Sequence, residues 1–181
     1  FPNLSGANGY KSLDRSQPPV GSIAVRWLYE RHGDRDFVAA VFDDLLIWNR
    51  WWMGKRLHHG YLCWGSNPFT PRMGGAFETW AVGEAKGAML ESGLDNSPMY
   101  DDVPFNADAG VLELADVLLN SLYVRDCQDL AVLARAIGRV NEAEELEQRT
   151  EALGRQLLTL WNEELGIFCN KRLDTGEFSP R

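Results

Sequence analysis

A run of polar residues from 91 to 102 holds the side chains of this sequence that are best suited to acid–base chemistry. It reads Glu-Ser-Gly-Leu-Asp-Asn-Ser-Pro-Met-Tyr-Asp-Asp, and Gly93 and Pro98 predict a loop that follows a helix. Polar groups on a loop held by rigid helices are where binding and chemistry usually occur. Asp95 lies just beyond the glycine that ends the helix, so we expect its carboxyl group to point into a pocket.

The charge pattern around this loop favours a carboxyl group that keeps its proton. No lysine or arginine occurs between Lys86 and Arg125, while the same window contains the carboxylates Glu91, Asp95, Asp101, Asp102, Asp108, Glu113 and Asp116. Crowded carboxylates without counter-charges tend to hold a proton near neutral pH, and such a group can protonate a leaving-group oxygen. Asp101, Asp102 and Asp108 are better explained as turn and cap residues. For Asp95 the residue types leave both roles open.

Two candidate contacts to a sugar lie outside this loop. Gln17, at a predicted helix start, is able to hydrogen-bond sugar hydroxyls, although its spacing alone favours an ordinary polar loop residue. Trp64 lies on a loop between Cys63 and Gly65 and is the best candidate for stacking against a flat apolar ligand, such as a sugar ring. Within the aromatic cluster to which Trp64 belongs, Trp52 and Trp80 fall on apolar stripes, so we expect them in the core. The cluster consists of Trp48, Trp51, Trp52, Tyr61, Trp64 and Trp80.

Motifs for other chemistries are absent from the sequence. His58 and His59 are adjacent, but no HExxH or other metal-site spacing surrounds them. The sequence contains no G-x-S-x-G elbow, no P-loop and no G-x-G-x-x-G fingerprint. The common signature motifs of hydrolases, NTPases and dinucleotide-binding proteins are therefore absent. We therefore predict no metal and no cofactor.

The composition is that of a soluble globular protein, with 45% hydrophobic and 24% charged residues among 181. The net charge of -8 argues against nucleic-acid and anionic-membrane partners, which require a basic surface. No apolar run approaches the roughly 18 residues that cross a bilayer. Cys63, Cys127 and Cys169 form no zinc or disulfide pattern, so we expect free thiols and a cytoplasmic location.

Hydrophobic periodicity predicts helices in pairs, with long loops after alternate helices. Asp34 is expected to cap the second helix directly after Gly33 ends the first, and Asn141 with Glu144 forms a capping box for the last. The third helix is rich in alanine and glycine, which indicates close packing. The predicted helices span residues 17–32, 35–56, 76–91, 106–125, 126–137 and 141–164, with a short strand at 61–64 and a β-hairpin at 167–178.

This all-α pattern is compatible with a helical solenoid or with a toroid of helical hairpins around a central pocket. The absence of a fixed-period repeat disfavours the solenoid. A toroid of six hairpins needs about twice the predicted helices. The first residue is not Met, so we expect residues 1–181 to be a single segment, the first half of an (α/α)6 catalytic domain, with short β-hairpins in its loops.

The octapeptide Glu-Ser-Gly-Leu-Asp-Asn-Ser-Pro at residues 91–98 resembles a motif of glycoside hydrolase family 63, whose members are inverting α-glycosidases on an (α/α)6 toroid. The segment Arg-Ser-Gln-Pro-Pro at 15–19 resembles a second motif of that family. The resemblance implies that Asp95 is the general acid, that Gln17 binds sugar, and that Glu91 and Asn96 shape the pocket around the acid. Tyr100, in the same loop, is a further candidate substrate contact.

The resemblance also implies a second carboxylate, a glutamate base in the later half of the toroid, at roughly 6.5 to 9.5 Å from the acid. No residue of this sequence matches that motif, so the C-terminal half of the toroid is an expected partner. Leu90 stands where smaller members of the family often have a tryptophan. The implied substrate is a small α-glucoside or α-mannoside, including a glycosyl-glycerate.

Two other functions remain open. A non-catalytic helical module that binds sugar or another protein would also lack the base. A trehalase-like α-glucosidase of family 37 would share Glu-Ser-Gly-x-Asp, but that family usually has Trp at the x position and Phe after the aspartate. Leu94 and Asn96 fit family 63 better.

Overall fold

A computed structural model describes residues 1–5, 11–68 and 79–181 of the chain. This part is mostly helical, as predicted. Its α-helices are α1 (Gly21–His32), α2 (Arg35–Arg56), α3 (Ala85–Ser92), α4 (Val117–Ala136) and α5 (Val140–Leu158), and its 3-10 turns are η1 (Thr79–Ala81) and η2 (Pro98–Tyr100). None of these helices is long and apolar enough to cross a membrane.

The first two helices form the predicted antiparallel hairpin. Gly33 ends α1 in the left-handed conformation, with φ 67°, and its N–H donates to the Tyr29 carbonyl oxygen at 2.7 Å. Asp34 caps α2, because its Oδ1 accepts a hydrogen bond from the Phe37 N–H at 2.9 Å. Local sequence signals therefore fix this hairpin and its turn.

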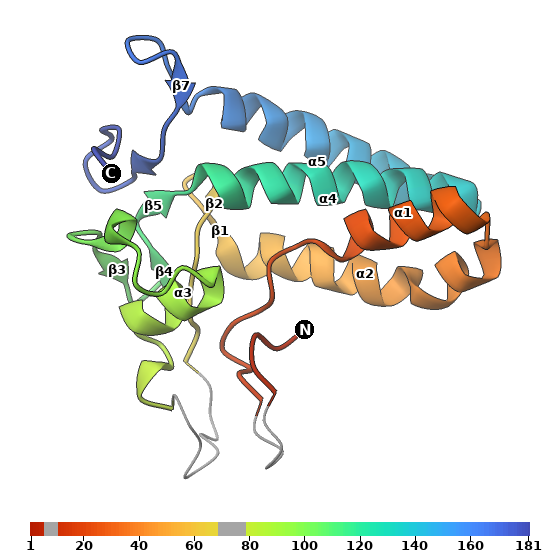
Figure 1. Cartoon of the computed structure of the whole chain (residues 1–181), viewed down its shortest axis with the longest axis horizontal. Coiled ribbons are helices and arrows are strands. Elements are labelled where there is room, and N and C mark those ends of the chain that lie inside the picture. The colour runs from red at the N-terminus through yellow and green to blue at the C-terminus, as the bar shows by residue number, and fades with distance from the viewer. Residues whose placement is uncertain (6–10, 69–78) are drawn as a thin grey trace.

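Helix α4 is the centre of the helical layer, since it packs against α1, α2 and α5 (Figure 1). Asp126, inside α4, joins three helices through its buried carboxylate. Its Oδ1 accepts from the Ser22 N–H at 3.1 Å and its Oδ2 from Asn49 Nδ2 at 2.8 Å. The predicted break at this aspartate is wrong, because its side chain bonds to other helices and α4 continues through it.

Residues 105–115 also differ from the prediction of a helix. They form the strands β3 (Phe105–Asn106), β4 (Val111–Leu112) and β5 (Leu114–Ala115). Gly110, with φ 71°, closes the turn between β3 and β4, and the Asp116 carboxylate caps α4 by accepting from the Leu119 N–H at 2.9 Å. Asp108 consequently lies in a strand turn and not at a helix start.

Helix α3 is shorter than predicted. The positive φ of Gly83, 74°, and the extended backbone of Glu84 precede its first turn, and the predicted start at Ala76 lies outside the described residues. The predicted close packing is confirmed at Gly87, where an added Cβ would lie 2.2 Å from the Ala81 carbonyl oxygen.

The C-terminal region departs from the prediction in three ways. The N-cap of α5 is Arg139 and makes no side-chain capping bond, so the capping box of Asn141 and Glu144 is wrong. An additional hairpin of β6 (Trp161–Asn162) and β7 (Ile167–Phe168) takes the place of the last predicted helical turns. Strand β8 (Lys171–Arg172) pairs with β5, and the predicted hairpin is reduced to a bridge between Lys171 and Phe178.

The short strands and α3 gather at one end of the helical layer, where α2 ends and α4 begins (Figure 1). There the hairpin of β1 (Leu57–His58) and β2 (Tyr61–Leu62) directly follows α2. The connection between α1 and α2 lies at the opposite end. The loop that follows α3, with the candidate acid, therefore belongs to the non-helical end of the molecule.

Candidate active site

The carboxylate of Glu91, in the last turn of α3, is the anchor of the candidate site. The side chain is fully buried and forms a bidentate ion pair with Arg56, with Arg56 Nε 2.6 Å from Oε2 and Nη2 2.8 Å from Oε1. The backbone N–H of Gly65 donates to Oε2 at 2.7 Å, and that of Ser16 donates to Oε1 at 2.8 Å. One carboxylate therefore holds the end of α2, the segment around Gly65 and the segment before Gln17.

Arg56 extends this network. Its Nη2 donates to the Asp14 carbonyl oxygen at 3.0 Å, and its Nη1 donates to Asn67 Oδ1. Gly65 has to be a glycine here, because an added Cβ would lie 2.4 Å from the Gly110 carbonyl oxygen and 2.9 Å from the Arg56 guanidinium. The sequence placed Arg56 only at the end of the predicted helix 35–56. Its partners lie far away in sequence, so no local signal could identify them.

Asp95 lies on a loop with a well-fixed backbone. Gly93 ends α3 with φ 72°, and the Leu94 N–H donates to Ser92 Oγ at 3.0 Å. Lys86, in the first turn of α3, donates from Nζ to the Asp95 carbonyl oxygen at 2.6 Å. The Asp95 side chain is half-buried, and within the described part of the chain its carboxylate receives no hydrogen bond. The position thus combines a held backbone with a carboxylate left for a ligand.

The charge argument from the sequence needs correction, because cations reach this loop from other elements. Arg56 pairs with Glu91, and Arg181 pairs with Asp101 at 2.9 Å and with Asp102 at 3.3 Å. Burial raises the pKa of Glu91, against the opposing effect of Arg56, and burial also raises the pKa of Asp116. Desolvation, and not the crowding of carboxylates, is the first cause at both groups.

The two predicted amide contacts lie at the surface. Gln17 is exposed, and its Nε2 donates to the Asn3 carbonyl oxygen at 2.6 Å. Asn96, directly after Asp95, is also exposed. Because Glu91 binds the N–H of Ser16, the residue before Gln17, the structure joins the two sequence motifs at one place.

Trp64, Tyr100 and Glu91 do not have the surface positions that direct contact with a substrate requires. Trp64 is 2% exposed, and its Nε1 donates to Asp116 Oδ2 at 2.9 Å, so the prediction of a stacking surface is contradicted. Tyr100 is also 2% exposed, and burial raises the pKa of its hydroxyl. Glu91 is buried and saturated by its donors, which leaves it a positioning role.

Trp80 differs from the prediction in the opposite direction. The sequence placed it in the core with Trp52, and Trp52 is indeed fully buried, whereas Trp80 is 65% exposed on η1. The prediction of a buried Trp80 assumed an α-helix at this position, but residues 79–81 form only the 3-10 turn η1. An exposed indole before α3 is therefore a candidate sugar contact that the sequence pattern missed.

The hollow that borders the Gln17 segment is small. It has a volume of about 140 Å³ and is lined by Phe1, Pro2, Ser12, Leu13, Arg15, Ser16 and Trp51. Binding sites for small molecules usually enclose about 300–1,000 Å³. The hollow beside the Gln17 segment therefore matches one side of a binding site and is too small to enclose a ligand.

A family model and a curated relative both connect this sequence to mannosylglycerate hydrolases. The sequence model of the mannosylglycerate hydrolase MGH1-like glycoside hydrolase domain matches residues 3–181. A mannosylglycerate hydrolase of Thermus thermophilus is 32% identical over 90 residues, which cover 48% of this chain and 17% of that protein.

Solved structures show the fold. The GH63 mannosylglycerate hydrolase of Thermus thermophilus in complex with glucose has a TM-score of 0.69 and 23% identity, over 98% of this chain and 47% of that one. The same enzyme in complex with Tris and D-glycerate has a TM-score of 0.62 and 20% identity, over 97% and 49%. The chain spans about half the length of these structures, and the prediction of half a helical toroid is confirmed.

Proposed function

Because the chain belongs to the MGH1-like glycoside hydrolase family, we propose that it forms the first half of the catalytic domain of an inverting α-glycosidase, with Asp95 as the general acid. The observation that carries this proposal is the Glu91 carboxylate, which binds Ser16, Gly65 and Arg56. It fixes the end of α3 against the Gln17 segment. Asp95 lies on the loop that begins directly after this anchored helix end, and its own carboxylate stays available.

The chemistry requires two carboxyl groups. Asp95 gives its proton to the glycosidic oxygen as the bond from that oxygen to the anomeric carbon breaks. A glutamate base on the later half of the toroid takes a proton from water, and the water oxygen bonds to the anomeric carbon from the opposite face. A separation of roughly 6.5–9.5 Å leaves room for that water and gives inversion. The small volume beside Ser16 agrees with a site that the other half completes.

The proposed substrate is a small α-glucoside or α-mannoside, including a glycosyl-glycerate. Its support is the name of the curated relative, a mannosylglycerate hydrolase, and the glucose and D-glycerate bound in solved relatives. Gln17 and Asn96 are exposed amides, and each supplies a donor and an acceptor for sugar hydroxyls.

The test is Asp95→Asn in the full-length protein that contains this segment. Loss of a general acid lowers kcat by about 10²–10⁴-fold, and the loss is greatest for substrates with poor leaving groups. We therefore expect a large loss on glycosyl-glycerates and disaccharides and a small one on an aryl α-glycoside whose phenol is strongly acidic. An equal loss on all substrates contradicts the role of Asp95 as acid.

The control is Asp101→Asn, which removes a carboxylate of the same loop that pairs with Arg181 at the surface. It should leave the dependence on the leaving group unchanged. A panel with trehalose, α-glucosides and α-mannosides separates a trehalase from the proposed enzyme. Binding of these sugars by the full-length protein without any turnover would indicate a sugar-binding module instead.

A further inference from the structure

The hairpin that follows α2 presents two adjacent histidines in an unusual turn. Its two-residue loop consists of His59, with φ 48°, and Gly60, with φ 86°, and it joins His58 in β1 to Tyr61 in β2. Hairpin loops with positive φ at both positions favour asparagine, aspartate and glycine at the first one. A histidine there accepts a backbone conformation that few non-glycine residues adopt.

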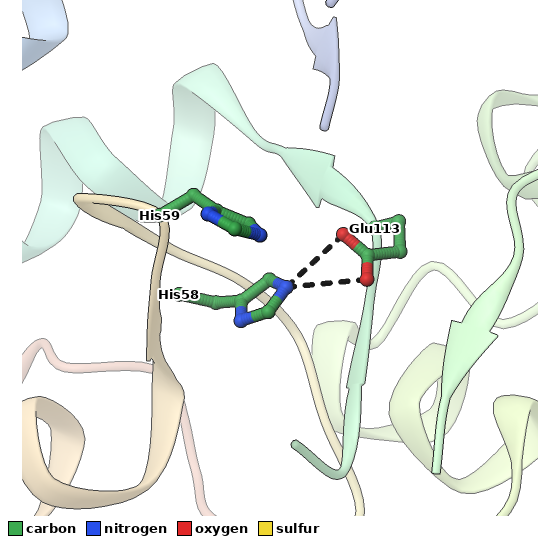
Figure 2. A group of neighbouring side chains, drawn as sticks. All are labelled: His58, His59 and Glu113. Atoms are coloured by element: carbon green, nitrogen blue, oxygen red, sulfur yellow. Dashed lines mark hydrogen bonds and ion pairs between the residues drawn. The ribbon is translucent and has the colours of Figure 1, made fainter. Parts of the chain in front are cut away.

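Both imidazole rings lie on the side of the hairpin that faces Glu113, which links β4 to β5 (Figure 2). His58 Nε2 is 3.2 Å from Oε1 and 3.1 Å from Oε2 of Glu113. The ring centroids of His58 and His59 are 4.2 Å apart. One ligand atom from each of the three side chains lies within 4.8 Å of the others.

The separations between His58 Nε2 and the Glu113 oxygens are close to those around a tetrahedral zinc ion. Ligand atoms at the usual distances of about 2.0–2.2 Å from zinc lie about 3.3 Å from one another. The His58 and Glu113 atoms already have this spacing. The His59 nitrogen has to move closer, and its exposed ring is able to rotate.

The surroundings of Glu113 favour a cation. Asn106 Nδ2 donates to Oε1 at 2.8 Å, which orients the carboxylate as an outer partner of a metal ligand does. The Leu173 N–H donates to the Glu113 carbonyl oxygen at 2.9 Å and holds the backbone. Within residues 1–5, 11–68 and 79–181, the Glu113 carboxylate pairs with no lysine or arginine.

We propose that His58, His59 and Glu113 bind a divalent transition-metal ion of the zinc class, with solvent completing its coordination. Two imidazoles and one carboxylate suit zinc, whereas magnesium and calcium prefer oxygen ligands alone. The ion joins the hairpin after α2 to the residue between β4 and β5, 55 positions after His58. Its role is to stabilise this end of the fold, so the proposal is independent of the glycosidase chemistry.

The test measures zinc binding to the full chain by calorimetry and by the shift in Tm after chelator treatment. We expect one ion per chain, a higher Tm with zinc, and no shift with magnesium. His58→Ala, His59→Asn and Glu113→Gln should each weaken zinc binding at least about tenfold. The matched control is His32→Ala, which removes the third histidine of the sequence, at the end of α1, and should bind zinc like the wild type.

His59→Asn is the decisive variant because asparagine suits a left-handed turn position and keeps the hairpin. Its Tm without zinc should equal or exceed that of the wild type. If the variant binds zinc as tightly as the wild type, or if zinc does not raise the wild-type Tm, the proposal is overturned. His58 and Glu113 then form a hydrogen-bonded pair without a metal.

Discussion

The Glu91 carboxylate accepts a hydrogen bond from the backbone N–H of Ser16 at 2.8 Å, across 75 positions of sequence. This bond places the segment of Gln17 beside the helix that leads to Asp95. Each of the two sequence motifs is ambiguous alone, since polar residues also close turns. Their meeting at a single buried carboxylate supports the proposal that both belong to one site.

Glu91→Gln tests this positioning role. The substitution keeps the shape of the side chain but leaves the Arg56 guanidinium buried without its counter-charge. Removing one partner of a buried ion pair typically destabilises a protein by about 3–5 kcal/mol. We expect a loss of this order in urea unfolding of the full-length protein, together with a lower kcat.

A double variant distinguishes loss of the Arg56–Glu91 ion pair from non-specific destabilisation by each substitution. Arg56→Met combined with Glu91→Gln removes both charges, so its free energy of unfolding should exceed that predicted by adding the two single losses. Simple additivity would show that the ion pair does not join these segments. The pH profile of kcat should keep its shape in Glu91→Gln, because Glu91 does not itself transfer a proton.

The sequence predicts those parts of the structure whose signals are local. Gly33 ends α1 and Asp34 caps α2 through residues no more than four positions away. The loop of Asp95 was identified in the same way, from Gly93 and its polar neighbours. Each of these features depends on the backbone conformation of one residue and its nearest neighbours in sequence.

Features set by distant partners could not be predicted in this way. Asp126 looked like a helix start, but its carboxylate bonds to Ser22 and Asn49 on two other helices. Trp64 looked like a loop tryptophan, but Asp116 binds its indole in the core. In both cases a hydrogen-bond partner far away in sequence determines whether the side chain is buried. Hydrophobic periodicity describes only neighbouring residues, so it could not predict these contacts.

The Asp126 carboxyl group makes stability depend on pH. Burial raises its pKa from 3.8 to about 6, although hydrogen bonds from Asn49 and Ser22 lower it in part. The folded state therefore binds the proton more tightly than the unfolded state. The stabilisation is complete below about pH 4 and is lost as the pH rises to about 6, a change of about 3 kcal/mol.

Asp126→Asn should remove this part of the pH dependence. Urea titration measures the free energy of unfolding of the wild type relative to that of the variant. This difference should fall by about 2 kcal/mol between pH 4 and pH 7. Asp108→Asn, in the exposed turn between β3 and β4, controls for the change of an aspartate to asparagine. A difference between wild type and Asp126→Asn that is the same at both pH values would contradict the assignment.

Trp80 allows a sharp comparison with Trp27, because each indole is 65% exposed. Trp80 lies on η1, which packs against α3, the helix that leads to the Asp95 loop, whereas Trp27 lies on α1. Stacking of a sugar ring on an indole is worth about 1 kcal/mol, so Trp80→Ala should raise KM about fivefold in the full-length enzyme.

Trp27→Ala should leave KM unchanged, and neither substitution removes buried area that the described fold depends on. The unfolding free energies of both variants should therefore stay within about 0.5 kcal/mol of the wild type. If the two variants have equal KM values, Trp80 does not contact the substrate. A large loss of stability in Trp80→Ala alone would instead place its indole against the C-terminal half of the toroid, and the KM effect would then be an indirect consequence of packing.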